Sequence, residues 1–203
     1  MSTRDITPNS EAYQPKFPLF YHYLEHHAEH TPQLIAIEEG DASMTYQDFN
    51  ARANQIADML IEREMPPGAT VGLYMSAKID LFVAMFAVLK AGCSFMLMSN
   101  DKAPPERLKL YLEIGKPDFV LYDDAHRNEV LIDTIRRDYN SACLDDVSLS
   151  ERSADNPNRE IDLDQLAYLF FSSGTTGAPK CIEILHRGIP YFIDSAAEVF
   201  STK

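Results

Sequence analysis

Residues 171–180 read FSSGTTGAPK, and the interpretation of the whole chain starts from this stretch. The apolar run Leu166–Phe170 in front of it predicts a buried strand. Behind it, Cys181–Leu185 predicts a second short strand. The stretch is therefore a strand-to-strand loop made almost entirely of glycine and hydroxyl residues and closed by Lys180.

This loop composition suits a polyanionic ligand. Gly174 and Gly177 permit positive φ angles, so consecutive backbone N–H groups can turn inward, while the hydroxyls and Lys180 add donors and a positive charge. The stretch differs from the P-loop of nucleotide hydrolases because its glycines are too close together and a strand follows, where that motif requires a helix. Composition alone fits a plain Ser/Thr/Gly turn between two strands equally well.

The order of the residues from Tyr168 to Lys180 resembles the signature phosphate loop of adenylate-forming (AMP-binding) enzymes. That superfamily includes acyl-CoA synthetases, luciferases and the adenylation domains of nonribosomal peptide synthetases. The resemblance implies that the loop holds the β- and γ-phosphates of ATP, with Thr175, Thr176 and Lys180 most directly involved. The nucleotide-binding residues expected in this way are Ser172, Ser173, Gly174, Thr175, Thr176, Gly177, Lys180 and His186.

His186 enters this set because Ile184–Arg187 resembles the end of the family's next strand, which a histidine follows. The resemblance makes His186 a candidate near the carboxylate or phosphate site. A residue at the start of a helix, bonded to the backbone, is an equal alternative. Cys181 departs from the family, which usually has glycine after the loop lysine, and its β-carbon is expected to reduce loop mobility.

A second resemblance points within the superfamily to the peptide synthetases. Residues 44–57, MTYQDFNARANQIA, resemble the first conserved block of their adenylation domains, and Leu89–Gly92 resembles the second. Thr45 is predicted to be a helix N-cap, and the block is expected to be scaffold without chemistry of its own. Residues 96–101 lack the prolines usual in the family at this point.

The middle of the chain predicts the fold class. Thr70–Met75 and Cys93–Leu97 are predicted strands, and Ile79–Ala91 is apolar nearly all round, as a buried helix ending at Gly92 would be. Strand, helix and strand with short links form a right-handed βαβ unit. We therefore predict an α/β fold with a mostly parallel sheet flanked by helices, corresponding to the N-terminal portion of the adenylate-forming fold, with an incomplete second lobe.

The remaining pattern predicts the domain organisation. A flexible tail is expected over residues 1–16, a first α/β lobe over 17–147, a linker over 148–160 and the start of a second lobe over 161–203. The further predicted elements are helices at Leu19–His30, Pro104–Ile114 (capped by Gly115), from an Asp124 cap to Tyr139 and after Gly188, with strands at Ile35–Glu38, Ser43–Thr45 and Asp118–Tyr122.

Charge and cysteine usage limit the possible partners and compartment. The chain of 203 residues has 18 Lys and Arg against 31 Asp and Glu, a net charge of −13, which argues against nucleic acid or an anionic membrane as partner. Three widely spaced cysteines indicate neither a disulfide framework nor a zinc site. We expect a cytoplasmic protein without a signal peptide or membrane span. His22, His26 and His30 have helical metal-ligand spacing, but solvated histidines on an amphipathic helix are the more common case, so no metal site is predicted.

The family reaction joins a carboxylic acid to ATP as an acyl-adenylate and then usually passes the acyl group to a thiol. The resemblance implies ATP and Mg²⁺ as cofactors and a carboxylic acid, here an amino acid, as substrate, with a phosphopantetheine-bearing carrier protein as partner. The family's adenine, ribose, Mg²⁺ and catalytic lysine residues have no counterpart in this chain, so we expect no complete catalysis by it alone. A non-catalytic nucleotide-binding or regulatory remnant and a fragment of an acyl-CoA ligase are the alternatives.

Overall fold

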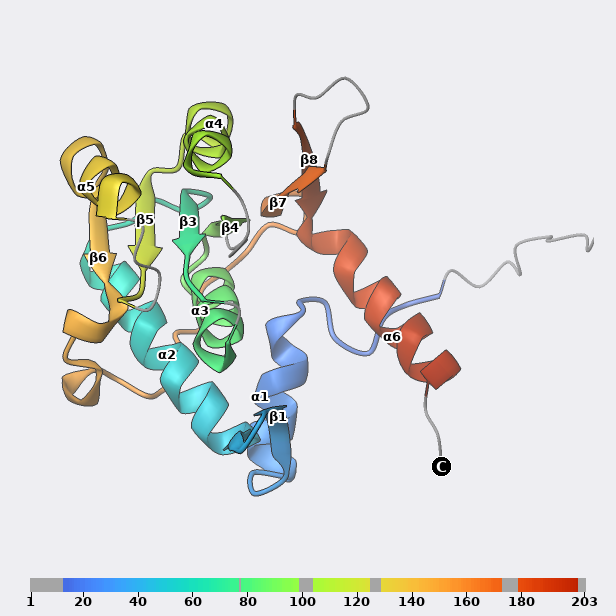
Figure 1. The fold of residues 1–203 in the computed structure, drawn as a ribbon. Helices are drawn as coiled ribbons and strands as arrows, with labels where there is room; N and C mark the ends of the chain where they lie inside the picture. The colour runs from blue at the N-terminus through green and yellow to red at the C-terminus, as the bar shows by residue number, and fades with distance from the viewer. Residues whose placement is uncertain (1–12, 77, 99–103, 125–128, 173–178, 201–203) are drawn as a thin grey trace, which may run out of the picture.

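The computed structural model describes residues 13–76, 78–98, 104–124, 129–172 and 179–200. Its centre is a six-stranded sheet in the order β6-β5-β3-β4-β7-β8 (Figure 1). All neighbouring strands in it are parallel except β7 and β8, which form an antiparallel hairpin. The strands are β3 Thr70–Tyr74, β4 Ser94–Leu97, β5 Phe119–Tyr122, β6 Ser141–Cys143, β7 Leu166–Ser172 and β8 Lys180–Leu185. The predicted mostly parallel α/β sheet is confirmed.

Helices cover both faces of this sheet (Figure 1). On one face lie α1, α2 and α3, and on the other lie α4 and α5. A last helix, α6, follows β8 and extends away from the sheet. The helices are α1 Tyr21–His30, α2 Tyr46–Glu62, α3 Ile79–Lys90, α4 Pro105–Gly115, α5 Glu129–Asp138 and α6 Ile189–Phe200, and a separate antiparallel ribbon pairs β1 Ile35–Glu39 with β2 Ala42–Thr45.

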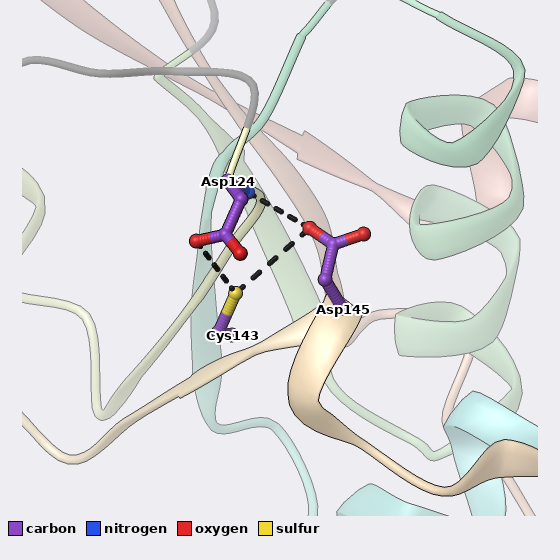
Figure 2. A group of neighbouring side chains, drawn as sticks. All are labelled: Asp124, Cys143 and Asp145. Carbon is purple, nitrogen blue, oxygen red and sulfur yellow. Dashed lines mark hydrogen bonds between the residues drawn. The ribbon is translucent and has the colours of Figure 1, made fainter.

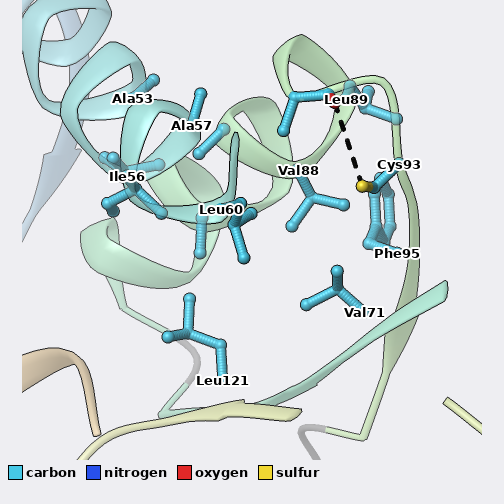
Figure 3. Packing of buried hydrophobic residues seen from close by; sticks show 14 of the residues in the cluster. Ala53, Ile56, Ala57, Leu60, Val71, Val88, Leu89, Cys93, Phe95 and Leu121 are labelled. Carbon is cyan, nitrogen blue, oxygen red and sulfur yellow. Dashed lines mark hydrogen bonds between the residues drawn. The ribbon is translucent and has the colours of Figure 1, made fainter. Parts of the chain in front are cut away.

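The larger core lies where α2 and α3 pack on the sheet (Figure 3). Ile56 and Leu60 of α2 and Val88 of α3 point toward Val71 of β3 and Leu121 of β5, and all five side chains are fully buried. Thr45 caps α2, because its hydroxyl oxygen accepts a hydrogen bond from the backbone N–H of Asp48 at 3.1 Å. The predicted cap and the predicted β3–α3–β4 unit are both confirmed.

The end of α4 and the strand β6 differ from the sequence-based expectations. Lys116, at φ +42°, takes the left-handed position at the end of α4, whereas Gly115 is still helical. Gly115 is needed for space, since a β-carbon there would collide with the thioether of Met96. Helix α5 is described over Glu129–Asp138, and because residues 125–128 lie outside the described residues, the Asp124 cap stays a prediction. The short strand β6 was not predicted.

The segment 148–160, expected to be a linker, is bound to the first helices. Asn54 of α2 donates its side-chain amide to the carbonyl oxygen of Ala154 at 2.7 Å and to Oδ1 of Asn156 at 2.9 Å. Arg152 contacts Asp58 and Glu62 of the same helix. Strand β7 then joins the same sheet beside β4. The division of the chain into two lobes stays a prediction.

Candidate phosphate-binding hairpin

The loop predicted to bind phosphate connects β7 to β8, and the structure fixes its two ends. Ser172 and Lys180 are direct cross-strand partners at the loop end of the hairpin. Five of the predicted residues, Ser173, Gly174, Thr175, Thr176 and Gly177, lie outside the described residues. The geometry therefore bears on Ser172, Lys180 and the strands that carry them.

Ser172 and Lys180 project from the same face of the hairpin, because directly opposed residues of an antiparallel pair share a face. Side chains alternate along a strand, so the pair Phe170 and Ile182 lies on that face too. Both of these apolar side chains are exposed. The hydroxyl and the ammonium thus lie together on an open surface of the sheet.

The opposite face of the hairpin is anchored to α4. Phe171 stacks on Tyr111 with ring centroids 4.2 Å apart and an interplanar angle of 10°. Cys181, the cross-strand partner of Phe171, packs against the same cluster of buried residues. Because this face is held, the side chains of Ser172 and Lys180 are directed away from α4. Cys181 was expected to reduce the mobility of the loop. Its packing beside Phe171 agrees with that expectation, which stays a prediction.

Lys180 is exposed and forms no ion pair among the described residues. That is notable in a chain with a net charge of −13. Arg187, by contrast, is paired with Asp164 at 2.7 Å near the other end of β8. An ammonium that no carboxylate neutralises is available to an anionic ligand.

His186 is not brought together with Lys180. It follows the opposite end of β8, and six extended positions separate the two residues by roughly 20 Å at about 3.3 Å per residue. The side chain is fully buried, and neither ring nitrogen has a partner among the described residues. The alternative was a residue at the start of a helix that is bonded to the backbone. His186 does begin the 3₁₀ turn His186–Gly188, and its backbone N–H donates to the carbonyl oxygen of Gln165 at 3.1 Å. Its ring, however, forms no such bond among the described residues.

The burial of His186 predicts a pH-dependent stability. Burial lowers its pKa to about 4, so the folded chain holds it neutral while the unfolded chain protonates it near the ordinary value of about 6.5. The neutral ring contributes fully above the unfolded pKa, and the contribution is lost as the pH falls toward the folded pKa. Between about pH 7 and about pH 5 the free energy of unfolding should fall by about 2 kcal/mol from this group alone.

Urea unfolding of the parent chain and of His186→Asn at both pH values measures this contribution. Other titrating groups contribute equally to both proteins, so the difference between the two pH dependences isolates His186. The parent should lose about 2 kcal/mol more than the variant on acidification. Equal losses would contradict a neutral buried imidazole.

Two contact sets were missed by sequence reasoning. Asp194 of α6 accepts hydrogen bonds from the Tyr23 hydroxyl at 2.6 Å, the Tyr13 hydroxyl at 2.9 Å and the backbone N–H of Lys16 at 2.7 Å. These bonds join α1 and the residues before it to the helix after the hairpin. In the second set, His30 Nδ1 lies 2.8 Å from the carbonyl oxygen of His26, so the histidines of α1 interact within the helix.

Comparison with known proteins decides the family. The sequence model of the AMP-binding enzyme family matches residues 24–202. The chain belongs to this family. Among known relatives it is 30% identical over 187 residues to tyrocidine synthase 3 of Brevibacillus parabrevis and 33% identical over 183 residues to phosphinothricin tripeptide synthetase PhsC of Streptomyces viridochromogenes. These alignments cover 92% and 88% of this chain but only 3% and 16% of those proteins.

Solved structures of the family share the fold. The nonribosomal peptide synthetase FmoA3 in its AMPPNP-bound form superposes with a TM-score of 0.79 at 22% identity, covering 95% of this chain and 20% of that one. A fatty acyl CoA synthetase of Mycobacterium tuberculosis superposes with the same TM-score at 23% identity, covering 94% and 39%. The predicted family and fold are thereby confirmed, and the chain is homologous to adenylation domains of nonribosomal peptide synthetases. None of the helices in the described part of the chain has the length and apolar character needed to cross a membrane.

Proposed function

We propose that this AMP-binding chain supplies the triphosphate-binding part of a ligase that activates an amino acid as its acyl-adenylate for nonribosomal peptide synthesis. The observation that carries the proposal is the pairing of Ser172 with an exposed Lys180, which has no ion-pair partner among the described residues, where the strands enter a Gly/Ser/Thr loop. Hydroxyl and ammonium groups on one open face are donors suited to phosphate oxygens. The likeness to tyrocidine synthase and phosphinothricin tripeptide synthetase supports the amino-acid substrate.

The hairpin would act by position and charge. Lys180, Ser172 and the loop residues Ser173, Gly174, Thr175, Thr176 and Gly177 would hold the β- and γ-phosphates, which leave as pyrophosphate when the carboxylate attacks the α-phosphate. Holding the leaving group neutralises the charge that develops on it. Mg²⁺, when bound, would come with the nucleotide and further neutralise its phosphates. His186 lies too far from Lys180 along β8 to share this role. An acyl-adenylate made in this way would pass to the thiol of a carrier protein.

Comparing ligands that differ only in phosphate content tests the proposal. ATP and inorganic pyrophosphate should both bind the 203-residue chain, measured by titration calorimetry, whereas AMP should bind at least tenfold more weakly because it lacks the β- and γ-phosphates. If AMP binds as tightly as ATP, the β- and γ-phosphates contribute nothing to affinity, and the proposed role of this loop is contradicted.

The substrate class needs a separate measurement. ATP–pyrophosphate exchange by the protein that carries this chain should depend on an amino acid and not on fatty acids. Exchange with fatty acids alone would favour the alternative of an acyl-CoA ligase. ATP binding without exchange in any complete protein would favour the alternative of a non-catalytic remnant.

A further inference from the structure

Asp124, Cys143 and Asp145 bring three potential metal ligands together at the carboxyl ends of β5 and β6 (Figure 2). The thiol sulfur of Cys143 lies 3.5 Å from Oδ1 of Asp124 and 3.9 Å from Oδ2 of Asp145. All three ligand atoms lie within 4.8 Å of one another. Throughout the described ranges, this is the only trio of His, Cys, Asp or Glu side chains with such spacing.

The two sulfur–oxygen separations match the ligand–ligand edges of a tetrahedral metal site. With metal–sulfur bonds of about 2.3 Å and metal–oxygen bonds of about 2.1 Å, a sulfur and an oxygen ligand lie roughly 3.6 Å apart. The two measured sulfur–oxygen distances, 3.5 and 3.9 Å, are within a few tenths of an ångström of that edge. A cation can therefore lie between the sulfur and either carboxylate oxygen with little movement of the backbone.

The hydrogen bonds at this trio leave lone pairs on the sulfur and carboxylate oxygens without a donor. The thiol has one proton and faces two carboxylate oxygens, so at least one sulfur–oxygen contact has no proton between the atoms. The backbone N–H of Asp124 donates to Oδ2 of Asp145 at 2.8 Å, which orients that carboxylate and leaves it further lone pairs. Neither Asp124 nor Asp145 forms a salt bridge within the described part of the chain. The nearby cation, Arg136, donates its Nε to the hydroxyl of Tyr122 at 2.8 Å.

The surroundings provide access and further negative charge. Cys143 is 4% exposed, so its thiol is shielded on the protein side, while both aspartates are exposed. Asp124 also lines an open cavity of about 420 Å³ whose wall includes the carboxylates of Glu129 and Asp133 and one cation, Arg136, so its carboxylates outnumber its cations. A dication can approach through this cavity, and solvent can supply the ligand that the protein does not.

The cluster is separate from the nucleotide site. Strands β3 and β4 lie between β5 and β7, which places three strand spacings, roughly 14 Å, between the end of β5 and the end of β7. An ion at Asp124 is therefore not the ion that accompanies ATP phosphates at Lys180.

We propose that Asp124, Cys143 and Asp145 form a binding site for a zinc-class divalent cation, with solvent as the fourth ligand. The thiolate selects zinc, cobalt or cadmium over Mg²⁺ and Ca²⁺, which prefer all-oxygen sites. On binding, a sulfur–metal bond replaces the S–H bond, and the proton leaves to solvent, one for each ion bound. The ion would join the ends of β5 and β6 at the edge of the sheet.

Cobalt titration of the metal-free chain tests this site, because a cobalt–thiolate bond gives a near-ultraviolet charge-transfer band. The band should saturate at one Co²⁺ per chain, disappear when Zn²⁺ is added and persist when Mg²⁺ is added. Cys143→Ser should abolish the band, and Asp145→Asn should weaken Co²⁺ binding at least tenfold. Absence of the band in the folded parent chain would overturn the proposal.

Matched variants distinguish the site from other thiols and acids. Cys181→Ser tests another thiol, and Asp146→Asn tests the exposed neighbour of Asp145; both should leave the band and the affinity unchanged. Circular dichroism of each metal-free variant establishes that it is folded. If Cys143→Ser does not fold, Asp145→Asn, a change at an exposed side chain, decides alone. A band that survives in folded Cys143→Ser, or an affinity unaffected by Asp145→Asn, would contradict the assignment.

Discussion

Replacing Lys180 with alanine is expected to weaken ATP and pyrophosphate binding about 30- to 100-fold. A charge-assisted hydrogen bond to phosphate contributes about 2–3 kcal/mol, and Lys180 has no carboxylate partner among the described residues that would otherwise hold it. Titration calorimetry on the parent and the variant measures the change. Lys180→Arg should restore part of the affinity, because it keeps the charge but not the shape of the donor.

Lys109→Ala is the matched control, since it removes the same charge from an exposed position on α4. It should change the affinity by less than about twofold once salt screens the long-range field. Equal weakening by the two substitutions would mean that net charge controls nucleotide binding. Unchanged affinity in Lys180→Ala would remove Lys180 from the phosphate site.

Replacing Glu25 with glutamine is expected to reduce the free energy of unfolding by about 3 kcal/mol. Lys90 of α3 has a fully buried side chain, and its Nζ lies 2.5 Å from Oε1 of Glu25 and 3.1 Å from Oδ1 of Asn156. Burial lowers the pKa of Lys90, whereas the charge of Glu25 raises it. Removing the carboxylate leaves a buried ammonium without a counter-charge. Urea unfolding at neutral pH measures the loss.

Glu29→Gln is the control, because Glu29 lies one turn further along α1 with its side chain 79% exposed. It should cost less than about 0.5 kcal/mol. The double variant Glu25→Leu, Lys90→Met should recover most of the stability, since it removes both buried charges together. Equal effects of Glu25→Gln and Glu29→Gln would show that the ion pair contributes nothing to the fold.

The sequence could predict those elements whose apolar pattern is complete within the element itself. Helix α3 is apolar nearly all round, and Gly92, at φ +77°, ends it as expected. Strands β3 and β4 could be predicted on either side of α3 because only short segments connect them to this helix. Helix α2 followed from the Thr45 cap and the stripe behind it. In each case a local signal and the tertiary packing agree.

Elements whose cause is tertiary could not be predicted in this way. Strand β6 is only Ser141–Cys143, too short to show a period, and exists because β5 offers it a parallel partner. Gly115 looked like a left-handed helix end, but its role is to leave space for Met96. The burial of Lys90 could not be predicted either, since its ion-pair partner Glu25 is on another helix.

For the candidate site, the sequence predicted the two strands that the loop connects but not how their pairing places the ends of the loop. Ser172 and Lys180 are brought together because the hairpin register pairs them. His186 is only six positions from Lys180 in sequence, yet an extended strand separates them. The proposed metal-ligand trio was missed because Asp124 follows β5 and Cys143 ends β6, so the two residues meet only through the β5–β6 pairing.

The central claim, that the loop between β7 and β8 binds the phosphates of ATP, is tested most directly by hydrogen exchange of backbone amides with and without ligand. Addition of ATP or pyrophosphate should slow exchange in peptides that span residues 171–181, because the loop N–H groups would then donate to phosphate oxygens. Peptides covering α5 should exchange at unchanged rates. Protection that appears elsewhere and leaves residues 171–181 unaffected would contradict the account.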